Sequence, residues 1–176
     1  GKFDLCIASN KESENFLRIL GSKNVKNYGN LKYSNIEDNT KQELDLNFLN
    51  TIKNRKIWCA ASTHSTEEIL CAKTHLKIKE NYKDIFTIII PRHINRVNEI
   101  NKELSNLNIN VVLSSELSKV NNKTDVLLVN SYGEAIKFYN ISKYVFVGKS
   151  LMESLIKDSG QNPIEPARSG CKIFYG

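Results

Sequence analysis

Short apolar runs alternate with longer amphipathic stretches along this chain, and this alternation is its clearest structural signal. An apolar run of about four to eight residues between polar turns is typical of a buried strand, and an amphipathic stretch of about ten or more is typical of a helix. Alternating strands and helices build parallel sheets. We therefore expect an α/β fold, with a Rossmann-like parallel sheet flanked by helices.

The expected elements follow one another with few interruptions. Strands are predicted at residues 3–8, 57–61, 86–90, 110–113, 125–129, 144–147 and 172–175, with a strand and turn between residues 25 and 32. Helices are predicted at residues 11–20, 48–53, 66–79, 95–107, 135–139 and 163–169. A polar stretch at 35–45 separates the first strand–helix unit from the rest, so we place one unit at 1–45 and a second at 46–176.

Composition narrows the class of protein. The 176 residues suffice for one α/β domain with a sizeable core, but not for two. The net charge of +6 would suit nucleic acid, but the lysines stand singly among acidic residues and asparagines, so we expect no nucleic acid partner. No apolar run of about 18 residues is present, so we expect a soluble chain without a membrane span.

The cysteines and histidines form no metal-binding pattern. The four cysteines lie far apart without a CxxC pair, which argues against a zinc site or a disulfide framework and predicts free thiols. His64, His75 and His93 do not share a helix-face spacing. We expect neither a metal nor a cofactor.

The two ends of the chain suggest a longer protein. The only methionine is Met152, and the chain opens with Gly1-Lys2 directly before an apolar strand. It stops at Gly176, where a strand would pass into a loop. We interpret the chain as one part of a longer polypeptide.

The segment from Ser159 to Arg168 carries the most specific chemical signal. Asn162 is a favourable N-cap residue, Pro163 suits the first helical position, and Glu165 falls at the capping-box position. A helix start offers unpaired N–H groups to a phosphate, and a glutamate in its first turn can accept both hydroxyls of a ribose. The alternative is that Glu165 only caps its own helix.

Polar clusters follow several of the predicted strands. In an open parallel sheet, ligands bind beyond the carboxyl ends of the strands, so these clusters are expected to meet at one edge. They comprise Ser62, Thr63 and His64; Pro91, Arg92, His93 and Arg96; Tyr132, Gly133 and Glu134; Gly148, Lys149 and Ser150; and Asn162, Pro163, Ile164 and Glu165. Their convergence predicts a ligand-binding site at that edge.

Each cluster by itself also has a simpler explanation. Ser62 and Thr63 could hold a phosphate or a sugar hydroxyl at a helix start, or could act as plain N-caps. Arg92 could pair with a phosphate or stack on a base, or could form a surface salt bridge. Glu134 could contact a ligand or merely open its helix. Lys32 could meet an anionic substrate or be an ordinary exposed lysine.

Familiar nucleotide-binding and hydrolase motifs are missing. The sequence has no Gly-x-x-x-x-Gly-Lys-Ser/Thr loop and no Gly-x-Gly-x-x-Gly fingerprint, which disfavours P-loop NTPases and classical dinucleotide binding. It also lacks the nucleophile elbow of a Ser/His/Asp hydrolase.

Taken in order, six segments resemble the Kdo transferases (3-deoxy-D-manno-octulosonic acid transferases), which are GT-B glycosyltransferases that move Kdo from CMP-Kdo onto lipid A precursors. The segments are residues 29–32, 60–64, 91–96, 132–134, 146–151 and 162–167. Each is weak alone, but six in the family's order and close to its spacing are specific. The resemblance implies the C-terminal, nucleotide-sugar-binding half of a GT-B enzyme, truncated at its C-terminus, with the last strand–helix unit of the acceptor half in front.

The resemblance also implies roles for individual residues. In the family, CMP is bound by the segments that match Pro91-Arg92, Tyr132-Gly133-Glu134 and Asn162-Pro163-Ile164-Glu165. The lysine that matches Lys32 is assigned to stabilising the transition state and is the catalytic candidate here. Further candidates for substrate contacts are Ser62, Thr63, His64, Arg96 and Ser150. The general base of the family is a glutamate of the N-terminal acceptor domain, and this chain has no counterpart for it.

Several positions depart from the family's pattern. Lys149 replaces a usual glycine, Gln161 a usual histidine, and Lys143 a usual aspartate. The loop from Met152 to Ser159 is a few residues longer than the pattern, and the Gly-Pro step and crossing helix expected after Gly176 are absent. These differences bear on loop contacts rather than on the resemblance itself.

The function implied is transfer of Kdo to a lipid A precursor in lipopolysaccharide biosynthesis, by direct displacement without a metal. The CMP-Kdo donor would bind here, whereas the acceptor and the cytoplasmic face of the bacterial inner membrane would be met by the missing N-terminal half. Two alternatives stay open. One is a GT-B transferase that uses a UDP- or GDP-sugar, and the other is a nucleotide-binding domain without catalytic activity.

Overall fold

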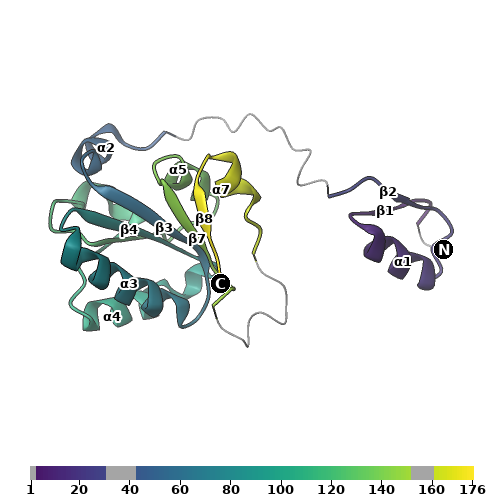
Figure 1. Ribbon diagram of the computed structural model, residues 1–176, viewed down its shortest axis with the longest axis horizontal. Coiled ribbons are helices and arrows are strands. Elements are labelled where there is room, and N and C mark those ends of the chain that lie inside the picture. Colours follow the sequence, from purple (N-terminus) through teal and green to yellow (C-terminus); the bar gives the residue numbers. More distant parts are fainter. Residues whose placement is uncertain (1–2, 31–42, 152–160) are drawn as a thin grey trace. The chain divides into compact units, whose positions relative to one another are not determined.

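The computed structural model describes residues 3–30, 43–151 and 161–176 (Figure 1). Lys32, most of the predicted linker and the loop from Met152 to Ser159 lie outside the described residues. The chain divides into two compact units, Gly1–Thr40 and Lys41–Gly176. No helix within the described ranges is long and apolar enough to cross a membrane.

The first unit is a single strand–helix–strand motif. Its elements are β1 (Cys6–Ala8), α1 (Lys11–Ile19) and β2 (Val25–Asn27), and the two strands pair in parallel. Asn10 caps the helix by accepting a hydrogen bond from the Ser13 N–H at 2.7 Å. The helix agrees with the prediction, but β1 is three residues shorter at its start because only Cys6 to Ala8 find partners on β2.

The second unit is built on a six-stranded sheet. Its strands are β3 (Lys56–Thr63), β4 (Ile85–Pro91), β5 (Val111–Leu113), β6 (Val126–Leu128), β7 (Tyr144–Val147) and β8 (Lys172–Phe174). They stand in the order β5-β6-β4-β3-β7-β8, and every neighbouring pair is parallel. The predicted α/β fold with a parallel sheet is confirmed.

Helices cover both faces of this sheet (Figure 1). They are α2 (Leu46–Ile52), α3 (Glu67–Asn81), α4 (Val97–Asn106), α5 (Ala135–Tyr139) and α7 (Ile164–Arg168), with 3-10 turns η2 (Ile94–Arg96) and η3 (Ser114–Lys119). Side chains of β4 alternate between the faces: Ile88 packs with Phe48 and Phe138 on one, and Ile89 packs with Ile100 and Leu104 on the other. Burying such a side chain contributes about 1.5–3 kcal/mol, so the two clusters hold the helices on the sheet.

The strand order creates a point where the chain changes direction. From β3 the chain passes through α3 to β4, which pairs with one side of β3, whereas β7 pairs with its other side. Beyond β3 the chain therefore continues toward β4 on one side of this strand pair, and beyond β7 it continues toward β8 on the other side. A crevice at such a switch point is where open α/β sheets bind ligands.

Several predicted bounds need correction. Ser62 and Thr63 do not lie at a helix start, because β3 continues through a bulge to Thr63, which pairs with Pro91, and α3 begins only at Glu67. The turn η3 was not predicted, since its polar sequence has no helical periodicity. Helix α7 has five residues and begins at Ile164, so Pro163 flanks the helix rather than opening it.

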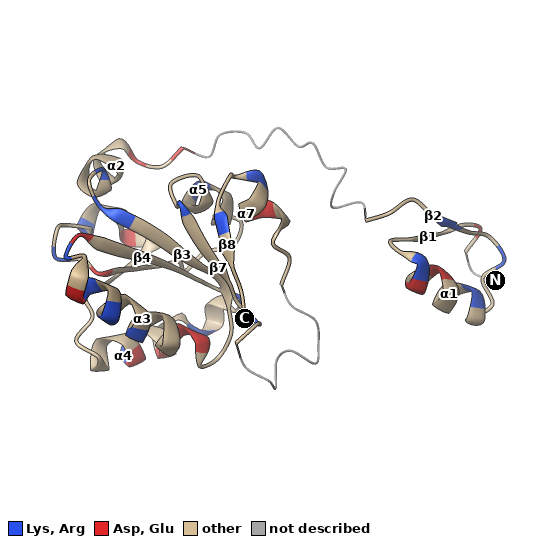
Figure 2. Cartoon of the chain, viewed as in Figure 1, with Lys and Arg blue, Asp and Glu red and all other residues tan. Residues whose placement is uncertain are grey.

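Charged residues are mixed over the surface. Figure 2 shows Lys and Arg interspersed with Asp and Glu along α1 and α3. Exposed ion pairs such as Lys56 with Asp84, 3.0 Å apart, neutralise part of the basic excess locally.

Candidate functional site

The candidate site lies at the carboxyl edge of the second unit's sheet, which we define as the loops at residues 62–66, 91–96, 130–134 and 148–151. Parallel pairing brings the ends of the strands together: Ala61 stands opposite Ile90 on β4 and Val147 on β7. The edge continues beyond the strands, since the Arg92 N–H donates to the Thr63 carbonyl at 2.9 Å. Four of the five predicted clusters thus share one edge.

The loops after β3 and β7 approach each other very closely. A Cβ atom on Gly148 would lie 2.5 Å from the Ser62 carbonyl oxygen and 2.7 Å from the Thr63 Cα, so only glycine fits there. Ser62, Thr66 and Lys149 adopt left-handed backbone angles, with φ values of 55°, 77° and 63°. Left-handed geometry at non-glycine residues is strained, and such strain gathers at functional sites.

Glu67 is the buried centre of these two loops. Its Oε2 accepts hydrogen bonds from the His64 N–H at 2.9 Å and the Lys149 N–H at 2.8 Å. Its Oε1 accepts from the N–H groups of Ser150 and Leu151 at 3.1 and 3.3 Å. The residue is fully buried, so these four bonds replace its contacts with water.

His64 links three loops of the edge. Its ring stands edge-on to that of His93, with centroids 5.6 Å apart, and its Nε2 lies 3.3 Å from the Gln161 amide nitrogen. Burial lowers the pKa of His64, which favours the neutral ring that can accept a hydrogen bond from Gln161. Through this contact Gln161, which directly precedes the fifth predicted cluster, reaches the edge.

The two arginines near the end of β4 have different surroundings. Arg96 donates to the buried Glu68 carboxylate at 3.1 Å and lies 3.5 Å from Glu99, so its guanidinium is held within the protein. The Arg92 side chain is exposed and has no ion pair among the residues that the structure describes. Of the two, Arg92 is the one placed to meet an anionic ligand.

The loop after β6 forms a polar network with the end of β5. Glu134 contacts Ser131 and Lys137 and accepts from the Ser114 hydroxyl at 3.3 Å. Burial alone would raise the pKa of Glu134, but the hydrogen bonds from Lys137 and Ser131 outweigh it, and the pKa is lowered. Tyr132 is 67% exposed beside this network.

The segment at α7 is only partly as predicted. The Asn162 side chain accepts from the Ile164 N–H at 3.1 Å, which supports the start of the helix. Glu165 is exposed in the first turn, and no return bond from it to the chain is found within the described ranges. The helix itself packs beside α5 and β8 (Figure 1), so Asn162, Pro163 and Ile164 lead away from Gln161 toward α5.

Two hydroxyl candidates are already engaged or covered. The Ser150 hydroxyl donates to the Val147 carbonyl at 2.8 Å and accepts from the Gly176 N–H at 3.1 Å. Thr63 is fully buried. Sequence reasoning missed the central role of Glu67, although two adjacent glutamates separated by only two residues from Ser62-Thr63-His64 could have suggested more than the start of a helix.

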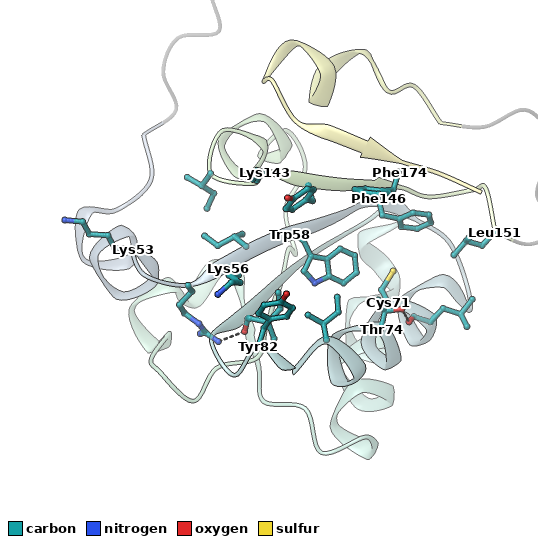
Figure 3. Close-up of a pocket in the computed structure, with 17 residues that line it drawn as sticks. Lys53, Lys56, Trp58, Cys71, Thr74, Tyr82, Lys143, Phe146, Leu151 and Phe174 are labelled. Carbon is teal, nitrogen blue, oxygen red and sulfur yellow. Dashed lines mark hydrogen bonds between the residues drawn. The ribbon is translucent and has the colours of Figure 1, made fainter. Parts of the chain in front are cut away.

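A large cavity lies elsewhere, on a face of the sheet beside β3, β7 and β8 (Figure 3). It has a volume of about 920 Å³, and its aromatic lining includes Trp58, Tyr144, Phe146 and Phe174. Four basic residues, Lys53, Arg55, Lys56 and Lys143, also line it. The cavity is mainly apolar and lies on the face of the sheet, and it meets the candidate site at Leu151 of the loop after β7.

Comparison with known proteins gives a consistent result. The chain is 35% identical to a 3-deoxy-D-manno-octulosonic acid transferase of Haemophilus influenzae over 84% of its own length, and 30% identical to that of Rickettsia prowazekii over 97%. It spans about a third of these relatives, 34% and 36% of their lengths. No protein-family model matches the chain.

A solved structure supports the same relationship. The crystal structure of the C-terminal CMP-Kdo binding domain of WaaA from Acinetobacter baumannii superposes with a TM-score of 0.61 and 31% sequence identity. The match covers 69% of this chain and 62% of that one. The resemblance that six short segments indicated is confirmed, as is the fold of the C-terminal half of a GT-B transferase.

Proposed function

Since this chain is related to the Kdo transferases, and matches the C-terminal domain of one of them in fold, we propose that it is the CMP-Kdo-binding part of such an enzyme. The longer protein would transfer Kdo to a lipid A precursor at the cytoplasmic face of the inner membrane. The observation that carries the proposal is the carboxyl edge itself, where the exposed Arg92 stands beside the switch point between β3 and β7. An anionic nucleotide sugar suits a cation at this place.

We assign the donor contacts to three places on the second unit. Arg92, after Pro91, binds the phosphate, and Tyr132 and Gly133 with Glu134 border the cytidine. Glu165 binds the ribose hydroxyls from the first turn of α7. Because α7 has only five residues, its dipole contributes less to phosphate binding than a longer helix would, and the side chains carry more of the affinity.

The reaction we propose is direct displacement. The acceptor hydroxyl oxygen attacks the anomeric carbon of Kdo, the bond from that carbon to the phosphate oxygen breaks, and CMP leaves. The proton of the acceptor passes to a base in the N-terminal half. Arg92, together with Lys32 from outside the described residues, stabilises the charge that develops on the phosphate.

CMP titration by calorimetry tests this assignment. Arg92→Ala and Glu165→Ala should each weaken CMP binding by about tenfold or more, since each removes hydrogen bonds to a charged or buried partner. Arg168→Ala, at the other end of α7, is the control and should bind CMP like the parent. CMP affinities equal to the parent's in both variants would contradict the site, and preference for UMP or GMP would point to a different nucleotide sugar.

A further inference from the structure

Glu67 has no role in the donor contacts, yet its carboxyl group is the most heavily hydrogen-bonded side chain at the carboxyl edge. We propose that Glu67 is a positioning residue, which holds the loop after β3 and the loop after β7 in the arrangement that the donor site requires. The inference rests on the proposed function, because the purpose of that arrangement is CMP-sugar binding.

The contacts of Glu67 run mainly to the distant loop. One of its four donors, the His64 N–H, belongs to its own loop, whereas the N–H groups of Lys149, Ser150 and Leu151 lie 82 to 84 residues away in sequence. Three consecutive main-chain donors aimed at one carboxyl group define the path of residues 149–151. Hydrogen bonds from N–H groups to a carboxylate are stronger than neutral ones, so the tie is firm.

A simple helix-start role does not explain this geometry. Glu67 is the first residue of α3, where an acidic side chain usually favours its own helix dipole. Here Oε2 would lie 2.8 Å from a Cβ on Gly148, so the loop after β7 passes directly over the carboxyl group. This close approach of the loop after β7 to the Glu67 carboxyl group fits a residue that holds the two loops together.

The tie acts on the site through neighbouring residues. Glu67 holds the main chain of His64, whose ring contacts His93 after β4 and Gln161 before α7. Glu67 also holds the loop after β7, in which Gly148 lies against Thr63. The Thr63 carbonyl in turn accepts a hydrogen bond from the Arg92 N–H. Loosening Glu67 is therefore expected to disturb the surroundings of Arg92 and of the segment that leads to Glu165.

The adjacent residue provides a matched control. Glu68 is as fully buried as Glu67, but its carboxylate pairs with Arg96 and so joins α3 to the turn η2. Glu68→Gln removes a buried negative charge of the same kind without touching the loop after β7. Comparing Glu67→Gln with Glu68→Gln separates loss of the loop tie from a general loss of stability.

The experiment measures three quantities for the 176-residue chain: the melting temperature, amide hydrogen exchange without ligand, and CMP affinity. Glu67→Gln should speed exchange at the amides of His64 and of residues 149–151 by about tenfold or more, because one oxygen becomes an N–H donor that opposes them. CMP affinity should fall by about tenfold or more as well. Glu67→Asp, with a shorter side chain, should show the same changes to a smaller extent and serves if Glu67→Gln does not fold.

The outcomes distinguish the two proposals. Glu68→Gln should lower the melting temperature while leaving exchange at these amides and CMP affinity within about twofold of the parent. If both Glu67 variants keep parental exchange and CMP affinity, Glu67 is only a stability residue and the inference is overturned. If the parent itself binds no CMP, the proposed function fails, and the exchange data alone then decide whether Glu67 ties the loops.

Discussion

The two ends of the parallel sheet use polar residues in opposite ways. At the amino end, Arg55 donates to the carbonyls of Thr124 and Ile85, both at 2.7 Å, and its guanidinium lies over the Phe86 ring. At the carboxyl end, Arg92 is exposed without an ion pair among the described residues. One arginine completes the main-chain hydrogen bonding of the fold, and the other remains accessible to a ligand.

The acidic residues differ in the same way. The buried Asp125, at the amino end, contacts Lys79, accepts from the Asn110 N–H at 3.1 Å and lies 3.5 Å from the His75 Nε2. Burial alone would raise its pKa, but hydrogen bonds from Lys79 and Asn110 outweigh it, and the pKa of Asp125 is lowered. Its partners have ordinary backbone geometry, whereas Glu67 holds loops that contain strained residues such as Ser62 and Lys149.

The polar residues at the two ends of the sheet therefore have different roles. Polar groups at the amino end stabilise the fold, and their geometry needs no ligand. The carboxyl end combines strain, close backbone approach and exposed polar groups, which lower local stability and suit binding. Substitutions at the amino end should therefore change stability without changing CMP affinity, whereas substitutions that displace the loops of the carboxyl edge should lower CMP affinity.

The largest expected effect on stability comes from Asp125→Ala. Removing this carboxylate leaves the Lys79 ammonium and the Asn110 N–H without their partner and takes away the charge beside His75, and should destabilise the fold by about 3 kcal/mol. Urea unfolding measures this loss, and calorimetry should show unchanged CMP affinity. Asp84→Ala, which breaks the exposed pair with Lys56 at the same end, should change stability by less than about 1 kcal/mol. A large loss of CMP affinity in Asp125→Ala would contradict the view that polar residues at the amino end only stabilise the fold.

A smaller effect on stability, but a large one on binding, is expected for Gly148→Ala. The new Cβ would overlap the Ser62 carbonyl and should destabilise the protein by about 2 kcal/mol while pushing the two loops apart. CMP binding should fall below detection by calorimetry. Gly170→Ala is the control: it is strained by a φ of 76° but has open space around it, so it should reduce stability by about 1 kcal/mol and keep CMP affinity.

The smallest expected effect is a gain in stability for Lys149→Gly. Lys149 has a φ of 63°, and glycine adopts this conformation without the strain that a side chain causes. Relief of that strain should stabilise the fold by about 0.5–1 kcal/mol in urea unfolding, and CMP affinity should stay within about twofold. A loss of stability would show that contacts of the lysine side chain outweigh the backbone strain.

Local patterns predicted most of the fold. The strand at residues 144–147 and the helix ending at Tyr139 lie where they were predicted, because apolar runs and turn residues act over a few neighbours. The turn η3 could not be found in this way, since its place is set by Ser114 and Ser115 bonding to Asn130 across the edge. The bulge that extends β3 to Thr63 likewise depends on its partner Pro91.

The candidate site was predictable only at the level of loops. Arg92 and Arg96 both follow β4 and look equivalent in sequence, and only the position of Glu68 on α3 shows that Arg96 is engaged. In the sequence, Glu67 is indistinguishable from an ordinary helix-start residue, and only its hydrogen bonds to residues 149–151 distinguish it. The usual glycine at position 149 is likewise explained only by the left-handed backbone there.

The sequence by itself determined the α/β class, the succession of strands and helices, and the relationship to the Kdo transferases. It could do so because hydrophobic periodicity and short motifs are properties of neighbouring residues. Only the tertiary structure decided the strand order, which places β7 beside β3, and with it the meeting of residues 62–67 with residues 148–151. Contacts between segments more than 80 residues apart depend on that order, so no local pattern could assign Glu67 its partners.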